Sequence, residues 1–362
     1  MKKVQRVDYM FQALRVAVGV TIAFLICLIV IALLTGSDGA QDAIYNFAIG
    51  PFTSKRRFAQ VLSRTGVYML TGCGMCFGYA SGRFSVISEG VINIAPIPIL
   101  IVMFGTNLMT NLPRGINLAI MLLACMLTGM AVSMIPAYGR ERLGADETVT
   151  SIILNSFCCF IALSILRGTV ADRSASFLAS PVYPDNMHYT RYLNGSNLHS
   201  GIWIAVLGFI AACIIFYRTR LGSEIRITGS NPAFAKYAGI NIRITMFMGQ
   251  VLGGVFAGMA ACIEVFGTYG QYYLSQLTNL GMDGLVVAVM AKKQPIFVPI
   301  TAFVLAYIRT SASVLNTNTN IPIELVTMLQ AVIIFFVAAE SFLGKFRQRA
   351  IIKISQESEA KG

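Results

Sequence analysis

The sequence predicts an all-α integral membrane protein with about ten transmembrane helices and both termini in the cytoplasm. Of its 362 residues 56% are hydrophobic and only 12% are charged, whereas soluble domains are about 25% charged. Apolar runs long enough to cross a bilayer recur along the chain. The 28 Lys and Arg residues lie in short clusters between these runs. The +12 net charge therefore reflects membrane topology and excludes a nucleic-acid-binding surface.

The apolar runs define the expected spans. The first covers residues 13–34 and is longer than the core of about 7–15 residues of a cleavable signal, so it predicts a retained span. Segment 282–291 is too short to cross about 30 Å of hydrocarbon alone, so either it is a half-helix or its true bounds are wider. Together with that segment, the later spans are expected at 61–80, 91–108, 115–138, 148–168, 201–217, 245–263, 296–315 and 322–343.

The loops between these spans follow the positive-inside rule. With the N-terminus inside, most basic residues fall on the cytoplasmic side, including a loop at 218–243 and a tail at 344–362. The main exception is the cluster that begins at Lys55. The largest predicted external loop, 169–200, is either a surface for an extracytoplasmic receptor or a passive connector.

The sequence indicates no catalytic and no metal site. It contains no G-x-x-x-x-G-K-[ST] motif, so it cannot hold nucleotide phosphates in the P-loop manner. All eight Cys lie in apolar stretches, where free Cys behaves as a small hydrophobic residue. The pair Cys73 and Cys76 lacks a second pair, and His188 and His199 lack a third ligand.

Pairs of glycines spaced four residues apart predict close helix packing. They are Gly74/Gly78/Gly82, Gly249/Gly253 and Gly254/Gly258. In lipid, small residues let helix backbones approach and gain dispersion contacts. We expect these faces to pack within one chain, with a dimer interface as the alternative.

A short capped helix is predicted within the basic loop at 218–243. Asn231 and Pro232 suit the start of a helix, and Gly239 suits its left-handed end. From these residues alone, a helix that docks on a partner and a solvated loop that sets orientation both remain open.

Four stretches, in chain order, resemble a known family. They read GRFSVISEG (82–90), GADETVTSIILN (144–155), GSNPAFAKYAGI (229–240) and GMDGLVVAV (281–289). The third resembles the cytoplasmic coupling segment of ABC importer permeases of the branched-chain amino acid, ribose and nucleoside group. The second and fourth most resemble nucleoside permeases that work with a lipoprotein receptor of the basic membrane protein kind.

The resemblance implies a single transmembrane permease domain over residues 1–362 that moves a small polar solute, most like a nucleoside, by alternating access. It places the chain in the cytoplasmic membrane as a multi-pass protein. It also implies three protein partners: an ATPase subunit that binds ATP and Mg²⁺, a second permease subunit, and an extracytoplasmic substrate-binding lipoprotein. No cofactor is expected in this chain. The implied ATPase-coupling residues are Asn231, Pro232, Ala233, Phe234, Ala235, Lys236, Tyr237, Ala238 and Gly239.

Six polar or aromatic residues are predicted to line the substrate pathway. Acids at membrane depth usually face a cavity or a partner, and a neighbouring glycine indicates a broken helix. Amides could bond an uncharged solute, and aromatic rings could stack on a base; helix-to-helix packing is the alternative for each. The six are Phe84, Glu89, Asn93, Asn155, Gln250 and Asp283.

The first stretch departs from its family's usual pattern, Phe-Asn-Ile-Gly-x-Glu-Gly-Gln. Ser85, Ile87 and Val91 stand where Asn, Gly and Gln are expected. Two explanations stay open: one half of a heterodimeric permease, or a different substrate. The competing functions are an importer of ribose-type sugars or branched-chain amino acids, a secondary transporter driven by an ion gradient, and a membrane-embedded lipid enzyme. The last would need clustered Asp, His or Arg, which the sequence lacks.

Overall fold

The computed structural model describes residues 41, 44–106, 109, 112–172, 177–193 and 195–318. These residues are helical and contain no strand, only an isolated bridge between Arg191 and His199. The chain divides into two compact units, Ser54–Ala306 and Met1–Thr53 with Tyr307–Gly362. The predicted spans at 13–34 and 322–343 and the tail at 344–362 lie outside the described residues.

Within the described residues, six helical stretches are long and apolar enough to cross a membrane. This confirms a multi-pass membrane protein, and each stretch overlaps a span predicted from the sequence. The six are Ser88–Gly105, Arg114–Leu143, Glu147–Val170, Gly201–Arg218, Ile242–Thr268 and Pro295–Thr317.

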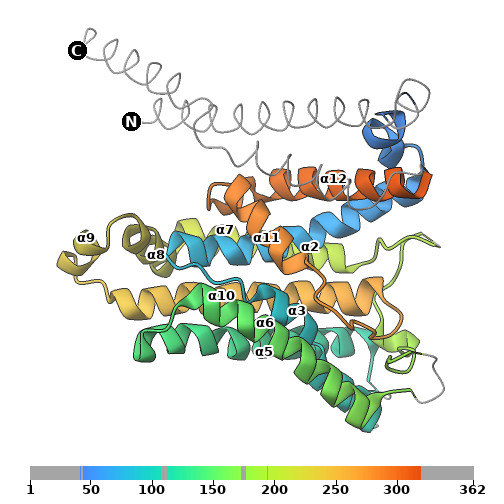
Figure 1. The fold of residues 1–362 in the computed structure, drawn as a ribbon, viewed down its shortest axis with the longest axis horizontal. Helices are drawn as coiled ribbons and strands as arrows, with labels where there is room; N and C mark the ends of the chain where they lie inside the picture. Colours follow the sequence, from blue (N-terminus) through green and yellow to red (C-terminus); the bar gives the residue numbers. More distant parts are fainter. Residues whose placement is uncertain are drawn as a thin grey trace. The chain divides into compact units, whose positions relative to one another are not determined.

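The centre of the larger unit is a set of long helices. Helix α10 (Ile242–Ile263) packs along both α5 (Arg114–Leu143) and α2 (Lys55–Ala80) (Figure 1). Helix α7 (Gly201–Arg218) packs on α2, and α6 (Glu147–Ile165) packs on the short helix α3 (Ser88–Ile94). Helix α2 covers the predicted span at 61–80 but is not among the six apolar stretches, because its basic, small and polar residues lower its mean hydropathy.

Glycines account for the close approach of α5 and α10. A methyl group on Gly129 of α5 would overlap the carbonyl oxygen of Gly254, and one on Gly258 would overlap that of Cys125. Gly74 of α2 likewise lies against Gly253. The glycine faces therefore pack within the chain, as expected from their spacing.

Two of the membrane helices are broken. The predicted span at 91–108 corresponds to the apolar stretch Ser88–Gly105, but this stretch is not one uninterrupted helix: α3 ends before Pro96, and a second helix, α4 (Ile97–Gly105), follows. Proline cannot donate the backbone hydrogen bond that a continuous helix needs. Helix α11 (Leu280–Met290) is short, as predicted for 282–291, and starts after Asn279, whose φ is 61°.

The remaining elements are short, apart from the last long helix. The turns are η1 (Gly50–Phe52), η2 (Leu166–Val170), η3 (Asp185–Met187), η4 (Glu264–Thr268) and η5 (Pro295–Phe297). Helix α12 (Val298–Asn318) begins in the larger unit, and its residues from Tyr307 onward belong to the smaller one. There the Tyr307 hydroxyl donates to the Ala48 carbonyl, and its ring lies 5.4 Å from that of Phe52.

Different segments occupy the two ends of the larger unit (Figure 1). Helices α8 (Arg220–Ser230) and α9 (Pro232–Tyr237) lie at one end. At the other, the backbone amides of Ser180, Tyr183 and Tyr189 donate to carbonyls of residues 266–272, at 2.9, 2.9 and 3.1 Å. Residues 180–189 of the predicted external loop are thus tied to the segment that follows α10.

A buried histidine packs inside this end of the unit. The ring of His199 fills the space that side chains on Gly201 and Gly267 would need. Burial, with help from nearby His188 and Arg191, lowers the pKa of His199 to about 4. The imidazole is therefore neutral at pH 7, and its Nδ1 accepts a 3.1 Å hydrogen bond from the Gly201 amide.

Candidate functional site

Helix α9 forms as its caps predict. The Asn231 side chain accepts a 3.0 Å hydrogen bond from the Phe234 amide, Pro232 occupies the first turn, and Gly239 has a φ of +76°. The helix ends at Tyr237, two residues before Gly239. A helix of this length is not stable alone in water, so its caps and its packing hold it.

The exposure of α9 separates a surface from an anchor. Phe234 is 58% exposed and Tyr237 92% exposed, whereas Ala235 is fully buried and its carbonyl accepts from the Ile240 amide at 3.0 Å. Of the nine predicted coupling residues, Ala235 alone is buried. It shapes the loop, and the other eight form the outer surface.

The first stretch, 82–90, is fastened to the second through an arginine that the sequence analysis missed. The Arg83 guanidinium lies 2.6 Å from a carboxylate oxygen of Glu147, at the start of α6, and 2.6 Å from one of Glu141, near the end of α5. All three side chains are at most 16% exposed. Because solvent screens them little, such pairs are stronger than surface ones. The sequence signal that could have indicated this cluster is the presence of oppositely charged residues at the ends of apolar spans.

Three side chains along one face of α6 extend this fastening. Each bonds backbone groups of residues 84–90, so the segment before α3 is held along its length. The bonds are Thr148 Oγ1 to Phe84 O (3.1 Å), Val86 N to Ser151 Oγ (3.1 Å), Asn155 Nδ2 to Val86 O (3.0 Å) and Gly90 N to Asn155 Oδ1 (2.8 Å).

These bonds support the helix-to-helix packing alternative for Asn155, whose place in the substrate pathway stays a prediction. Replacing it with leucine is expected to destabilise the protein by about 1–2 kcal/mol, since a buried amide and a buried carbonyl lose their partners. Thermal unfolding in mild detergent measures this loss. Ile153→Ala is the control, because Ile153 lies on the same helix and is 65% exposed. An unchanged midpoint with impaired solute binding would make Asn155 a substrate ligand.

Glu89, in the first stretch, caps the helix formed by the fourth. Helix α11 has no side-chain cap of its own at Asn279. The Glu89 carboxylate takes that place, and a negative charge is favourable at a helix N-terminus. It accepts from Thr278 Oγ1 (3.0 Å), Asn279 N (2.6 Å), Gly281 N (2.7 Å) and Met282 N (3.4 Å).

The same contact explains two further residues. A side chain on Gly281 would overlap the backbone of Glu89, so glycine is needed for the short helices α3 and α11 to meet. Asp283, one turn along, accepts a 2.6 Å hydrogen bond from the Tyr68 hydroxyl and ties α11 to α2. Glu89 and Asp283 are therefore bonded to the protein itself.

The other three predicted pathway residues, Phe84, Asn93 and Gln250, have ring surface or polar atoms that no hydrogen bond within the described protein occupies. Phe84 is 46% exposed and stacks on Tyr79, with ring centroids 4.9 Å apart. The side-chain oxygen of Asn93, both polar atoms of Gln250 and the Tyr79 hydroxyl are buried and have no hydrogen-bond partner among the described residues. Buried polar groups without partners are costly, so these atoms are the candidates to bind a polar solute.

Two of the residues that depart from the family pattern, Ile87 and Val91, lie in the protein interior. Ile87 and Val91 are 4% and 0% exposed and belong to a hydrophobic core cluster. At these two positions the chain presents packing surface in place of the glycine and glutamine expected from the resemblance.

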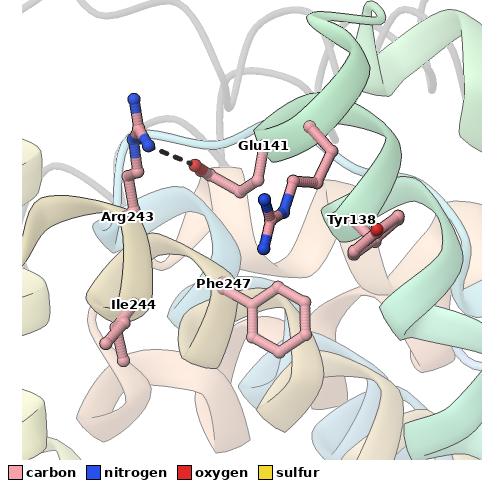
Figure 2. A pocket seen from close by; sticks show the side chains of 6 residues that line it. Tyr138, Glu141, Arg243, Ile244 and Phe247 are labelled. Carbon is pink, nitrogen blue, oxygen red and sulfur yellow. Dashed lines mark ion pairs between the residues drawn. The ribbon is translucent and has the colours of Figure 1, made fainter.

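A pocket lies near α9, between the end of α5 and the start of α10 (Figure 2). Arg243 approaches Glu141 to 4.0 Å across it, and the Arg243 side chain is 84% exposed. The pocket is lined by Tyr138, Glu141, Arg142, Arg243, Ile244 and Phe247.

Comparison with known proteins assigns the fold to a family. The family described as branched-chain amino acid transport system, permease component, matches residues 57–338. The chain belongs to this permease family. The match includes all four stretches quoted above and every residue of the ties between them. No solved structure matches the permease.

Relatives of the permease are named for several different substrates. It is 28% identical to the nucleoside ABC transporter permease protein NupB of Lactococcus lactis, over 87% of this chain and 88% of the relative. It is 24% identical to the glucose permease protein TsgB13 of Haloferax volcanii (88% and 85%). It is 26% identical to the guanosine permease protein NupP of Bacillus subtilis (75% and 78%). A second nucleoside permease of the same Lactococcus strain, NupC, matches over 94 residues at 29% identity.

Proposed function

We propose that this permease is the membrane subunit of an ATP-driven importer that carries nucleosides across the cytoplasmic membrane. The observation that carries the proposal is α9, a capped helix at one end of the bundle with Phe234 and Tyr237 exposed. Two exposed aromatic rings on a short, fixed helix suit a protein cleft. The cleft would belong to an ATPase subunit, which would bind ATP and Mg²⁺, and this chain would need no cofactor.

The substrate class follows from the relatives and from the residues left unpaired. NupB and NupP are named for nucleosides and guanosine. A half-exposed ring at Phe84 suits stacking on a base, and the free amide of Gln250 suits hydrogen bonding to one. Ribose-type sugars and branched-chain amino acids are the alternatives within the family, and one relative is named for glucose.

The proposed topology has about ten crossings, both termini in the cytoplasm and α9 on the cytoplasmic side. The basic residues of α8 and α9 support this orientation through the positive-inside rule. The tied-down segment at 177–193 then faces outward, where a substrate-binding lipoprotein would deliver the solute.

The second permease subunit is proposed to be a different chain. Ile87 and Val91 are core residues here, where Gly and Gln are usual in the family. The same Lactococcus strain has two nucleoside permeases that match this chain. A heterodimer would let the partner subunit keep the fuller pattern.

A secondary transporter is the other candidate, and the acids bear on it. Such a mechanism needs intramembrane acids that bind ions or protons during transport. The Glu89 carboxylate already accepts from four donors of residues 278–282. This occupation favours the ATP-driven mechanism.

Purification from the native membrane in mild detergent tests the proposal. A P-loop ATPase and a second permease are expected to copurify. Liposomes that contain the complex and its receptor are expected to accumulate tritiated guanosine only when ATP is present on the side of the membrane that carries the ATPase. Recovery of the chain alone, with guanosine uptake driven by an ion gradient, would overturn the proposal.

The α9 surface gives a sharper prediction. Tyr237→Ala and Phe234→Ala are each expected to weaken ATPase association by about 1–3 kcal/mol, since aromatic anchors carry most of the binding energy at an interface. Copurification of the ATPase at fixed permease concentration measures this. Phe177→Ala is the control, because Phe177 is also 57% exposed but lies at the opposite end. Full ATPase recovery with both α9 variants would contradict the docking assignment.

A further inference from the structure

The last turn of α8 is one place where the loop at 218–243 packs closely against the helix bundle. Gly229 lies two residues before the cap of α9, and a methyl group on it would overlap the carbonyl oxygen of Ala80 at the end of α2. From the other side, a methyl group on Gly82 would lie 3.6 Å from the Gly229 Cα. No side chain lies between these two backbones, so α8 cannot move toward α2 without displacing the end of α2.

The residue that follows this contact joins three helices. Gly82 has a φ of +84° and turns the chain, and Arg83 comes next. Its Nη1 and Nη2 each lie 2.6 Å from a carboxylate, on Glu147 of α6 and Glu141 of α5, and its Nε lies 3.0 Å from the sulfur of Met246 on α10. A planar guanidinium holds two carboxylates in fixed directions, which an ammonium does not.

The chain beyond Arg83 leads directly to both half-helices. Residues 84–90 are bonded along α6, and Glu89 then holds the N-terminus of α11. An uninterrupted series of backbone contacts and hydrogen bonds thus connects α8 with α3 and α11. The series passes through all four stretches that carry the family resemblance.

We propose that Gly229 and Arg83 transmit the movement of α9 to the half-helices α3 and α11. They are positioning residues: neither is proposed to touch solute or ATPase. The inference rests on the proposed function, because it assumes that a partner moves α9. The alternative is that these contacts only stabilise the helix ends, and a coupling measurement separates the two.

Substitution of Gly229 tests the transmission in the complete transporter. The full-length permease is reconstituted in liposomes with its ATPase, partner permease and receptor, and ATP hydrolysis and tritiated guanosine uptake are measured on one sample. Gly229→Ala is expected to keep hydrolysis within about twofold and to lower uptake at least about tenfold. Ser230→Ala is the matched control, since Ser230 is the next residue and is exposed; both activities should be unchanged.

A second variant keeps the test decisive if Gly229→Ala does not assemble. Arg83→Lys retains the charge and loses the fork, so hydrolysis without uptake is again expected. Uptake within about twofold of wild type in Gly229→Ala or, failing its assembly, in Arg83→Lys would overturn the inference. A wild-type complex that hydrolyses ATP without importing guanosine would refute the proposed substrate or function and not the transmission.

Discussion

Replacing Glu89 with alanine is expected to destabilise the permease by roughly 3–5 kcal/mol, which is typical of removing one partner from a buried charged network. Glu89 is 1% exposed and accepts from three backbone amides and one hydroxyl. Without it, the first turn of α11 keeps buried donors with no acceptor. Thermal unfolding in mild detergent should show the loss as a lower midpoint.

Two further variants distinguish a cap from an ordinary surface charge. Glu89→Gln keeps one acceptor oxygen but turns an amide nitrogen toward backbone donors, so most of the loss should remain. Glu224→Ala removes an exposed i,i+4 pair with Arg220 and should change stability by less than about 1 kcal/mol. A Glu89→Ala protein that unfolds at the wild-type midpoint but no longer binds nucleoside would instead support the predicted place of Glu89 in the substrate pathway.

A single methyl group on Gly258 is expected to destabilise the protein by about 3 kcal/mol or more, because it overlaps backbone and no side-chain rotation relieves it. The nearest atoms belong to the α5 backbone at Cys125 and Met126. Helices α5 and α10 would have to separate to admit it. The yield of folded protein and its thermal midpoint should both fall.

Gly253→Ala is the matched control on the same helix. There the methyl group would lie 3.2 Å from the Gly74 carbonyl oxygen, so a shift of a few tenths of an ångström suffices. Alanine also has a higher helix propensity by about 1 kcal/mol, so the net change should lie within about 1 kcal/mol of zero. Equal effects of the two variants would contradict the close packing of α10 on α5.

Local features of the fold could be predicted from the sequence. The caps of α9 act within nine residues, and the short apolar run at 282–291 limits α11 directly. The break between α3 and α4 was not predicted, although Pro96 was visible. Apolar residues continue on both sides of that proline, and hydropathy does not distinguish one helix from two.

The candidate site was less predictable because its partners are distant in the chain. The Gly281 amide and the Glu89 carboxylate are 192 residues apart, so the sequence shows a buried acid and not what it caps. The same applies to Asn155, whose bonds reach back to Val86 and Gly90. Arg83 lay inside a recognised stretch, but neither of its two carboxylate partners could be assigned without the fold.

The fixed conformation of segment 177–193, which is bonded to residues 266–272, would lower the free-energy cost of docking a receptor there. Its backbone is already fixed by the amides of Ser180, Tyr183 and Tyr189, so a receptor that binds there would not have to order it. Ordering of loops and side chains is a main cost of association. A receptor that docked on such a preformed surface would lose little conformational entropy on binding, and its release would not require a loop to unfold.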